Sequence, residues 1–268
     1  MLINLEQFHD KGFQVFPGVM AMNEVEAIKQ RVDRYNEIIM EKESPLMYFK
    51  ELLFHPQVQH LVSSILGSGQ YVVHHLHASC HRAGMPSLGW HHDYEAFRKS
   101  DRTHNMIHVF LYLNGMRREI GELLVVPGSH KTVFGRYEYS SFDFNAFPDV
   151  VSIDELPVGS IVVVHSALCH ARRALPGGEC HPRYFIDLSF CHTDGCWMPY
   201  LEGGDWRKLL SELCAYAEGA YDGRYSFMFN SRVFKTRFKD KALDYFKVRA
   251  LYNRVRVMMN PNKVKNGM

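Results

Sequence analysis

The sequence predicts a mainly β protein with a double-stranded β-helix core, the jelly-roll or cupin-like fold, and flanking N- and C-terminal helices. Several short stretches between residues 71 and 192 have the length and patterning of strands, turn signals separate them, and no helical pattern intervenes. Such a series is typical of an antiparallel barrel or jelly roll. A chain of 268 residues suits one large domain. We therefore expect a single domain over residues 1–268, divided into parts 1–70, 71–192 and 193–268.

The N-terminal part is predicted to be helical. Asn23 can cap a first helix, with Glu26 three residues later able to reach back to it. Pro56 can open a second helix and Gly67 can end it, with apolar residues at helical spacing between them.

The central part is predicted to contain strands of two kinds. The stretches "ELLVV" and "GSIVVVH" are continuous apolar runs of strand length, whereas "MIHVFLYLN" and "RYFIDLSFC" alternate between two faces. In the last stretch Arg183, Asp187 and Ser189 share one face, and apolar residues occupy the other. The polar face is expected to line a cavity.

The C-terminal part is expected to be mainly helical and basic. From Ser231 onward there are 11 Lys or Arg and 2 acids, a net charge of +9 in a chain of net charge +2. We interpret this segment first as a helix with a solvated basic face. The alternatives are a segment that guides an anionic substrate and one that meets nucleic acid or an acidic membrane surface. A modest overall charge argues against nucleic-acid binding. The oligomeric state is not readable.

The location of the protein is predicted from two absences. We find no secretory signal and no apolar run long enough to span a bilayer. The six cysteines follow no regular framework, so reduced thiols are expected. These observations predict a cytoplasmic protein without membrane contact.

The stretch "GWHHDYEAF" contains the strongest chemical signal. Of 16 histidines, 13 lie between His74 and His192. On or near a strand, His91 and Asp93 share a face while His92 points away. A histidine and a carboxylate at this spacing can bind one metal ion, provided that a distant strand supplies a third ligand. Trp90, Tyr94 and Phe97 either shape the pocket or pack in the core.

The preferred third ligand is His170, in "SALCHARR", which follows the buried run "GSIVVVH". His165 is the rival, but the run before it has the pattern of a strand interior. Two histidines and one carboxylate leave metal positions open, as in non-haem iron(II) oxygenases. Such enzymes commonly use 2-oxoglutarate, whose far carboxylate needs a cation. Arg183 suits this role because its guanidinium can pair with a carboxylate through two hydrogen bonds.

The sequence resembles the phytanoyl-CoA dioxygenase family of Fe(II)/2-oxoglutarate oxygenases over about residues 5 to 191. The stretches that carry the resemblance are "WHHDY", "GELLVVPGSHK", "LPVGSIVVVHSALCH", "FHDKGFQVFPGVMAMNEVEAI" and "FHPQVQHLVSSILG". The resemblance implies that His91, Asp93 and His170 bind iron and act in catalysis, and that Arg183 anchors 2-oxoglutarate.

The chain departs from the family pattern at two points. The spacing from His170 to Arg183 is slightly long, with "PGGE" expected to bulge outward. Where many members have a lysine, this chain has "HRAG". His81 or Arg82 could supply a second co-substrate contact in its place, and the alternative is a solvated loop. Ser189, on the face of Arg183, is a further candidate contact.

These observations predict an Fe(II)/2-oxoglutarate-dependent dioxygenase that uses O2 to oxidise a small-molecule metabolite, releasing succinate and CO2. Hydroxylation of an unactivated C–H bond is the preferred outcome, with desaturation or demethylation as alternatives. An intact Asp93 argues against halogenation, which needs a small residue there. The rival function is a non-catalytic jelly-roll protein that binds a metal or ligand. The substrate itself is not readable.

Overall fold

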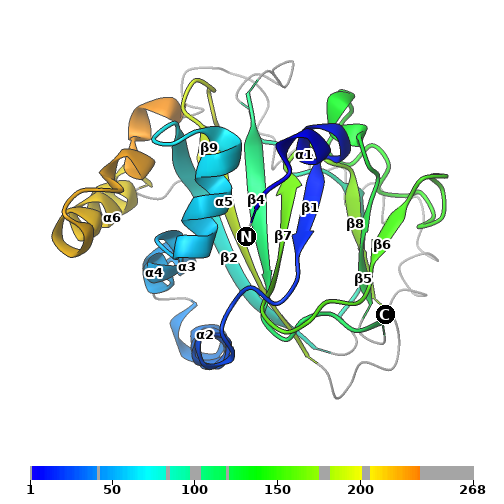
Figure 1. Ribbon diagram of the computed structural model, residues 1–268, viewed down its shortest axis with the longest axis horizontal. Coiled ribbons are helices and arrows are strands. Elements are labelled where there is room, and N and C mark those ends of the chain that lie inside the picture. Colours follow the sequence, from blue (N-terminus) through cyan, green and yellow to red (C-terminus); the bar gives the residue numbers. More distant parts are fainter. Residues whose placement is uncertain are drawn as a thin grey trace, which may run out of the picture.

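The computed structural model describes two antiparallel β-sheets, with helices on one side of the larger sheet (Figure 1). The described residues are 2–40, 43–82, 85–96, 104–118, 121–174, 182–200 and 206–235. The predicted jelly-roll core with flanking helices is confirmed. Most of the basic C-terminal segment lies outside the described residues, as does Phe97.

Among the described residues, the larger sheet has five strands in the order β1-β7-β4-β9-β2, and the smaller sheet has four in the order β3-β8-β5-β6. The strands of the larger sheet are β1 (Phe13–Phe16), β7 (Ser160–His165), β4 (Met106–Tyr112), β9 (Arg183–His192) and β2 (Tyr71–His81). Those of the smaller sheet are β3 (Leu88–His91), β8 (His170–Arg173), β5 (Glu122–Val125) and β6 (Val151–Ile153). All named pairings are antiparallel.

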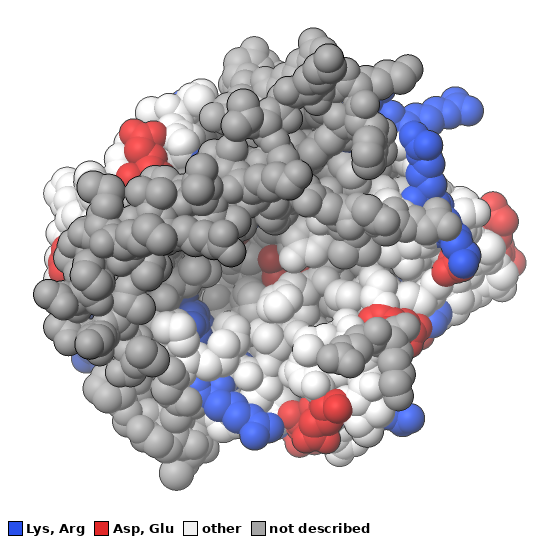
Figure 2. All heavy atoms as spheres, turned by 180° about the vertical axis from the view of Figure 1, so that it is seen from behind, with Lys and Arg blue, Asp and Glu red and all other residues white. Residues whose placement is uncertain are grey.

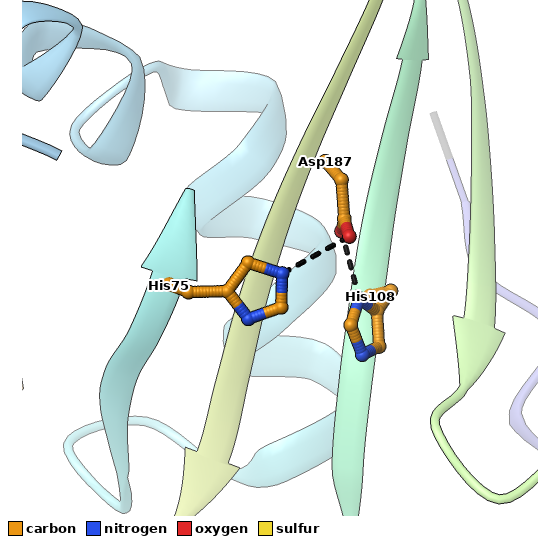
Figure 3. Close-up of side chains that lie close together, drawn as sticks. All are labelled: His75, His108 and Asp187. Carbon is orange, nitrogen blue, oxygen red and sulfur yellow. Dashed lines mark hydrogen bonds and ion pairs between the residues drawn. The ribbon is translucent and has the colours of Figure 1, made fainter. Parts of the chain in front are cut away.

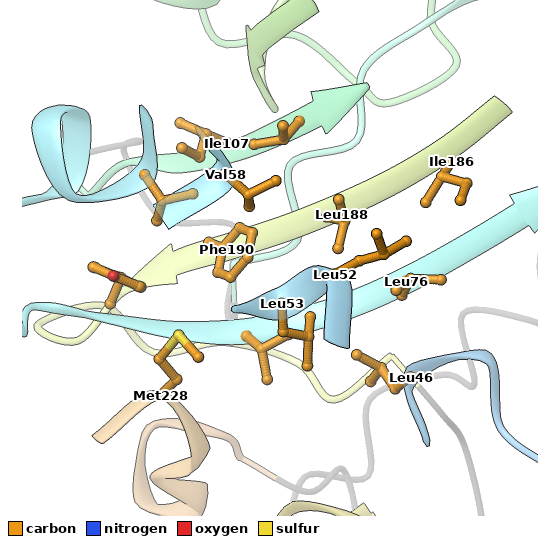
Figure 4. Packing of buried hydrophobic residues seen from close by; sticks show 14 of the residues in the cluster. Leu46, Leu52, Leu53, Val58, Leu76, Ile107, Ile186, Leu188, Phe190 and Met228 are labelled. Carbon is orange, nitrogen blue, oxygen red and sulfur yellow. The ribbon is translucent and has the colours of Figure 1, made fainter. Parts of the chain in front are cut away.

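The helices cover the outer face of the larger sheet. They are α1 (Leu5–Lys11), α2 (Met22–Arg34), α3 (Pro45–Tyr48), α4 (Lys50–Leu53), α5 (Pro56–Leu66) and α6 (Trp206–Tyr221). A π-helical turn η1 (Tyr35–Ile39) extends α2, and short 3-10 turns lie at η3 (Ser129–Lys131), η4 (Ser226–Phe229) and η5 (Ser231–Val233). Figure 4 shows Leu52, Leu53 and Val58 from the helices packed near Leu188 and Phe190 of β9. Because this outer face is buried against the helices, the apolar side chains on that face of the sheet point toward them.

Alternation along the strands then determines which side chains face the interior between the sheets. On β4, Val109 and Leu111 join the outer core. Phe110 and Tyr112 instead pack with Leu123 of the smaller sheet. Because side chains alternate, His108 shares the inner face of β4. The same rule places Arg183, Asp187 and Ser189 on the inner face of β9, as the sequence predicts.

Two details of the N-terminal part differ from prediction. Helix α2 begins at Met22, after Ala21, which makes no side-chain cap, so the prediction of Asn23 as the cap is wrong. The segment between α1 and α2 contains strand β1, which pairs with β7. A strand of four residues is too short to show an alternating pattern in the sequence, so β1 is recognised only from its pairing with β7. Helix α5 begins at Pro56 and ends before Gly67, as predicted.

Among the described residues, no helix combines the length and the apolar composition that crossing a membrane requires.

Candidate metal centre and its surroundings

His91, Asp93 and His170 lie together between the ends of two neighbouring strands. Strand β3 ends at His91 and pairs with β8, and His91 lies directly opposite His170. His170 Nε2 is 3.3 Å from one Asp93 oxygen, and His91 Nε2 is 3.8 Å from the other. The ligand atoms of the three side chains all lie within 4.8 Å of one another. This spacing suits a single metal ion held by two imidazoles and one carboxylate.

Backbone carbonyls fix both imidazoles with Nε2 toward the centre. His91 Nδ1 lies 2.8 Å from the Gly89 carbonyl oxygen, and His170 Nδ1 lies 3.0 Å from that of Leu168. A metal-binding histidine typically donates its other N–H in this way. Gly89 is required by space, because a Cβ there would lie 2.5 Å from the carbonyl oxygen of Ser140.

The electrostatics of the group favour a cation. Burial, followed by the charge of His170, lowers the pKa of His91 to about 4. Burial alone would raise the pKa of Asp93, but His91, His170 and Arg136 together hold it well below its usual value. Near neutral pH the group thus offers a neutral His91 imidazole and a carboxylate. These are the protonation states that bind metals.

Arg136 supports the centre, although no sequence pattern singles it out. Its guanidinium donates to Asp93 Oδ1 at 2.9 Å and also pairs with Glu95. It thereby fixes the orientation of the Asp93 carboxylate. Arg136 lies in a long irregular segment far from Asp93 in the sequence, so no local sequence pattern predicts its contact with Asp93.

The neighbouring histidines have other partners. His92 Nε2 lies 3.1 Å from the Phe134 carbonyl oxygen, and His92 Nδ1 accepts from the Tyr94 backbone. His165 packs between Tyr94 and His130, and it is not in the metal-capable group. The structure therefore brings His170, rather than His165, beside His91.

The aromatic residues of the motif are used for packing. Trp90 is fully buried against Phe144 and Phe147. Tyr94 is buried in the outer core, and its hydroxyl donates to the His104 carbonyl.

Arg183 is a buried cation at the start of β9. It is 4% exposed, and one terminal nitrogen lies 3.2 Å from His81 Nδ1. Its Nε has no hydrogen-bond partner in the part of the chain that the structure describes. Within the described part of the chain, no carboxylate forms an ion pair with it. Burial lowers the pKa of Arg183, and burial followed by Arg183 lowers the pKa of His81 to about 3. A buried guanidinium beside a neutral imidazole suits an anionic ligand.

Ser189 lies elsewhere on β9. Its hydroxyl bonds to His75 Nδ1 at 2.7 Å, and it lies 3.2 Å from His74 Nδ1. Six residues separate it from Arg183, about 20 Å along a strand. This position argues against the expectation that Ser189 contacts the same ligand as Arg183.

A second polar group, which the sequence did not reveal, lies on the inner face of the larger sheet. Asp187 of β9 lies between His75 of β2 and His108 of β4 (Figure 3). His108 Nδ1 is 2.7 Å from one carboxylate oxygen, and His75 Nε2 is 3.1 Å from the other. Phe110 connects the two groups, since its ring centroid lies 5.7 Å from that of His108 and 6.1 Å from that of His170.

The molecular surface is hollowed on the side opposite to the view of Figure 1. Figure 2 shows this hollow, with a small acidic surface inside it. The side chains of Asp93 and Asp187 retain 17% and 12% exposure, so both groups reach the accessible surface.

Comparison with known protein families identifies the family of the chain. The model of a family described as "Phytanoyl-CoA dioxygenase (PhyH)" matches residues 8–174. The chain belongs to this family. It is therefore a non-haem iron, 2-oxoglutarate-dependent oxygenase, with iron(II) and 2-oxoglutarate as cofactor and co-substrate. A search of curated proteins found no match.

Solved structures of similar fold include other iron/2-oxoglutarate enzymes. HygX from Streptomyces hygroscopicus with iron bound is 20% identical, with a TM-score of 0.57 over 72% of this chain and 88% of that one. The 2-oxoglutarate-dependent epimerase SnoN from nogalamycin biosynthesis is 17% identical, with a TM-score of 0.59 over 73% and 84%. The carbocyclase SnoK of the same pathway is 17% identical, with a TM-score of 0.58 over 76% and 88%. These similarities show the shared fold.

Arg136→Ala is expected to weaken iron(II) binding by about 10- to 100-fold, the usual effect of losing a residue that orients a metal ligand. The measurement is an anaerobic metal titration. Arg118→Ala is the matched control, because Arg118 is 78% exposed and pairs only with Asp154 among the described residues. Equal iron affinity in the Arg136 variant and the control would show that Arg136 does not position Asp93.

The buried His74 is expected to make the folded state sensitive to acid. Burial, followed by the charge of His75, lowers the pKa of His74 to about 4. An unfolded histidine has a pKa near 6.5, so the unfolded chain binds more protons as pH falls from about 6.5 toward 4. His74 alone should lower the free energy of unfolding by about 2 kcal/mol between pH 7 and pH 5. Urea denaturation of the wild type and of His74→Gln tests this, and an unchanged pH dependence in the variant would contradict it.

Proposed function

We propose that the chain hydroxylates an unactivated C–H bond of a small-molecule metabolite. In this reaction 2-oxoglutarate and O2 are consumed, succinate and CO2 are released, and one oxygen atom enters the substrate. The observation that carries the proposal is the combination of a two-histidine, one-carboxylate group with a buried arginine that lacks a carboxylate partner in the described chain.

In this proposal His91, Asp93 and His170 would hold the iron through two imidazoles and one carboxylate. The metal supplies the oxidising chemistry when it is bound. Arg183 pairs with the far carboxylate of 2-oxoglutarate, and His81 provides a second polar contact beside it. Arg136 keeps the Asp93 carboxylate in place.

The walls between Arg183 and the metal centre support this arrangement. Phe185 of β9 packs against Phe110 and Tyr112 of β4, at ring-centroid distances of 5.2 Å and 5.4 Å. These rings lie on the inner face that leads from Arg183 toward His170. An apolar wall excludes water and strengthens a charge pair in the same space.

We further infer that residues 1–268 act as one oxygenase domain. Strand β1 from the N-terminal part extends the larger sheet. The N-terminal helices and the C-terminal helix α6 share one buried cluster with that sheet. Removing either part would expose that cluster.

The substrate is proposed to be a small molecule on the basis of similar structures. One HygX structure holds nickel, 2-oxoglutarate and hygromycin B, and one SnoN structure holds iron, 2-oxoglutarate and nogalamycin RO. The test is a metabolite screen with iron(II), 2-oxoglutarate and O2 that follows succinate release and searches for product 16 mass units heavier than substrate. His91→Ala is the inactive control. Substrate-dependent succinate with a product two mass units lighter would favour desaturation over hydroxylation.

A further inference from the structure

We propose that His108, held in place by Asp187, is a substrate anchor whose Nε2–H donates a hydrogen bond to an acceptor oxygen of the substrate. The inference rests on the proposed function, because it identifies the class of molecule that this site takes. That class is oxygen-bearing metabolites, in which a carbonyl or carboxylate oxygen lies near the carbon to be oxidised.

The first support is the hydrogen-bond arrangement of the group. Both oxygens of Asp187 have a ring nitrogen within hydrogen-bond distance, from His108 and from His75. His75 Nδ1 has Ser189 as its partner. His108 Nε2 is buried and has no hydrogen-bond partner among the described residues, and the residue is 1% exposed. In Figure 3 this nitrogen points away from Asp187. A buried polar atom without a partner is costly, so a ligand atom there would relieve the cost.

The second support is position. His108 is on the inner face of β4, and one aromatic ring, that of Phe110, separates it from His170. Asp187 lies four residues beyond Arg183 on β9, about 13 Å along the strand. A five-carbon co-substrate that extends from the metal to Arg183 therefore lies toward the other end of this face. His108 lies opposite Ser189, six residues along β9 from Arg183, so we assign it to the molecule to be oxidised rather than to 2-oxoglutarate.

The third support is charge. His75, His108 and Asp187 are close enough to hold a metal, so a second metal site is the competing interpretation. Burial would lower the pKa of His108, but the adjacent Asp187 outweighs it and raises that pKa. The reciprocal effect of His108 and His75 lowers the pKa of Asp187 despite its burial. The Asp187 carboxylate thus favours the protonated form of His108, which has no lone pair for a cation and donates from both nitrogens. The group therefore favours an oxygen acceptor.

Tyr200 connects the group with the surface. Its ring stacks on His75 at 4.3 Å with an interplanar angle of 18°, and the residue is 40% exposed. His74 Nε2 lies 2.9 Å from the carbonyl oxygen of Met198 and so fixes the segment before Tyr200. A partly exposed ring thus lies over His75, the neighbour of His108 in the group.

The test is nuclear magnetic resonance on the full chain labelled with 15N-histidine and loaded with zinc(II) and 2-oxoglutarate. Acetate and acetone are the probes for anionic and neutral oxygen acceptors, and methylammonium is the control without an acceptor. We expect acetate, acetone or both to shift the His108 Nε2 signal saturably, while methylammonium does not. In His108→Phe the affinity for the effective probe should fall about tenfold to a hundredfold, the value of a hydrogen bond to a charged group.

Two further variants separate a loss of probe binding from a loss of folding. His108→Asn, which retains a neutral donor, should recover part of the probe affinity. His77→Asn, on the same face of β2 but outside the group, should leave it unchanged. Both must bind zinc and 2-oxoglutarate like the wild type.

Three results would overturn the inference. One is intact binding of 2-oxoglutarate with no probe moving the His108 signal. Another is two zinc ions per chain, with the second lost in His108→Phe, which would establish the metal interpretation. The third is a wild-type chain that binds no 2-oxoglutarate in the presence of metal, which would overturn the proposed function as well.

Discussion

His91→Ala is expected to abolish 2-oxoglutarate turnover and to weaken iron(II) binding by more than about 100-fold. Losing a residue that only orients a metal ligand costs about 10- to 100-fold, and His91 would itself be a ligand. The remaining Asp93 and His170 would leave one carboxylate and one imidazole for the metal. An anaerobic iron titration and a succinate assay measure the two effects.

His92→Ala is the matched control, because the neighbouring side chain has different partners. It loses contacts with the Phe134 carbonyl and the Tyr94 backbone, which should lower the free energy of unfolding by about 1–3 kcal/mol. Its iron affinity should be largely retained. Equal loss of iron by the two variants would refute the assignment of His91 as the ligand.

Arg183→Ala is expected to weaken 2-oxoglutarate binding while leaving iron affinity nearly unchanged. Removing one partner of a buried charge pair typically costs about 2–5 kcal/mol, since the other charge is left desolvated. This corresponds to roughly thirty-fold to a few thousand-fold in affinity. Arg183→Lys should recover only part of the loss, because an ammonium lacks the planar fork of the guanidinium. Titration of 2-oxoglutarate into each iron-loaded variant measures the loss in Arg183→Ala and the partial recovery in Arg183→Lys.

The nearby arginines of β8 serve as controls because the structure gives each a partner. Arg173 pairs with Glu122, and Arg172 donates to the carbonyl of Pro86. Neither replacement by alanine should change 2-oxoglutarate affinity as strongly. Normal binding in Arg183→Ala together with a large loss in Arg172→Ala would move the anchor to Arg172.

The sequence predicted those parts of the site that follow from local pattern. Period-two alternation placed Arg183 and Asp187 on one face of β9, and the spacing in "WHHDY" placed Asp93 beside His91. The apolar run "GSIVVVH" pointed to His170 as the partner from another strand. Each of these predictions came from the pattern within one segment. Side chains alternate between the two faces of a strand, so their direction follows from their position along it.

The residues that sequence reasoning missed depend on contacts between distant segments. Arg136 reaches Asp93 from an irregular segment 43 residues away. His75, His108 and Asp187 meet only because β9 lies between β2 and β4 in the sheet. Strand order and register are not visible in any one strand. A bulge between Val73 and His75 also shifts the register of β2, so alternation from its start would have misplaced His75.

The measurement that tests the central claim most directly is anaerobic addition of 2-oxoglutarate to the full chain and iron(II), followed by visible absorption. The account predicts a weak charge-transfer band that saturates at one iron and one 2-oxoglutarate per chain. The band should be absent in His91→Ala, and in Arg183→Ala it should require much more 2-oxoglutarate. A chain that binds iron(II) yet shows no band at any 2-oxoglutarate concentration would contradict the account and would favour a non-catalytic binding protein.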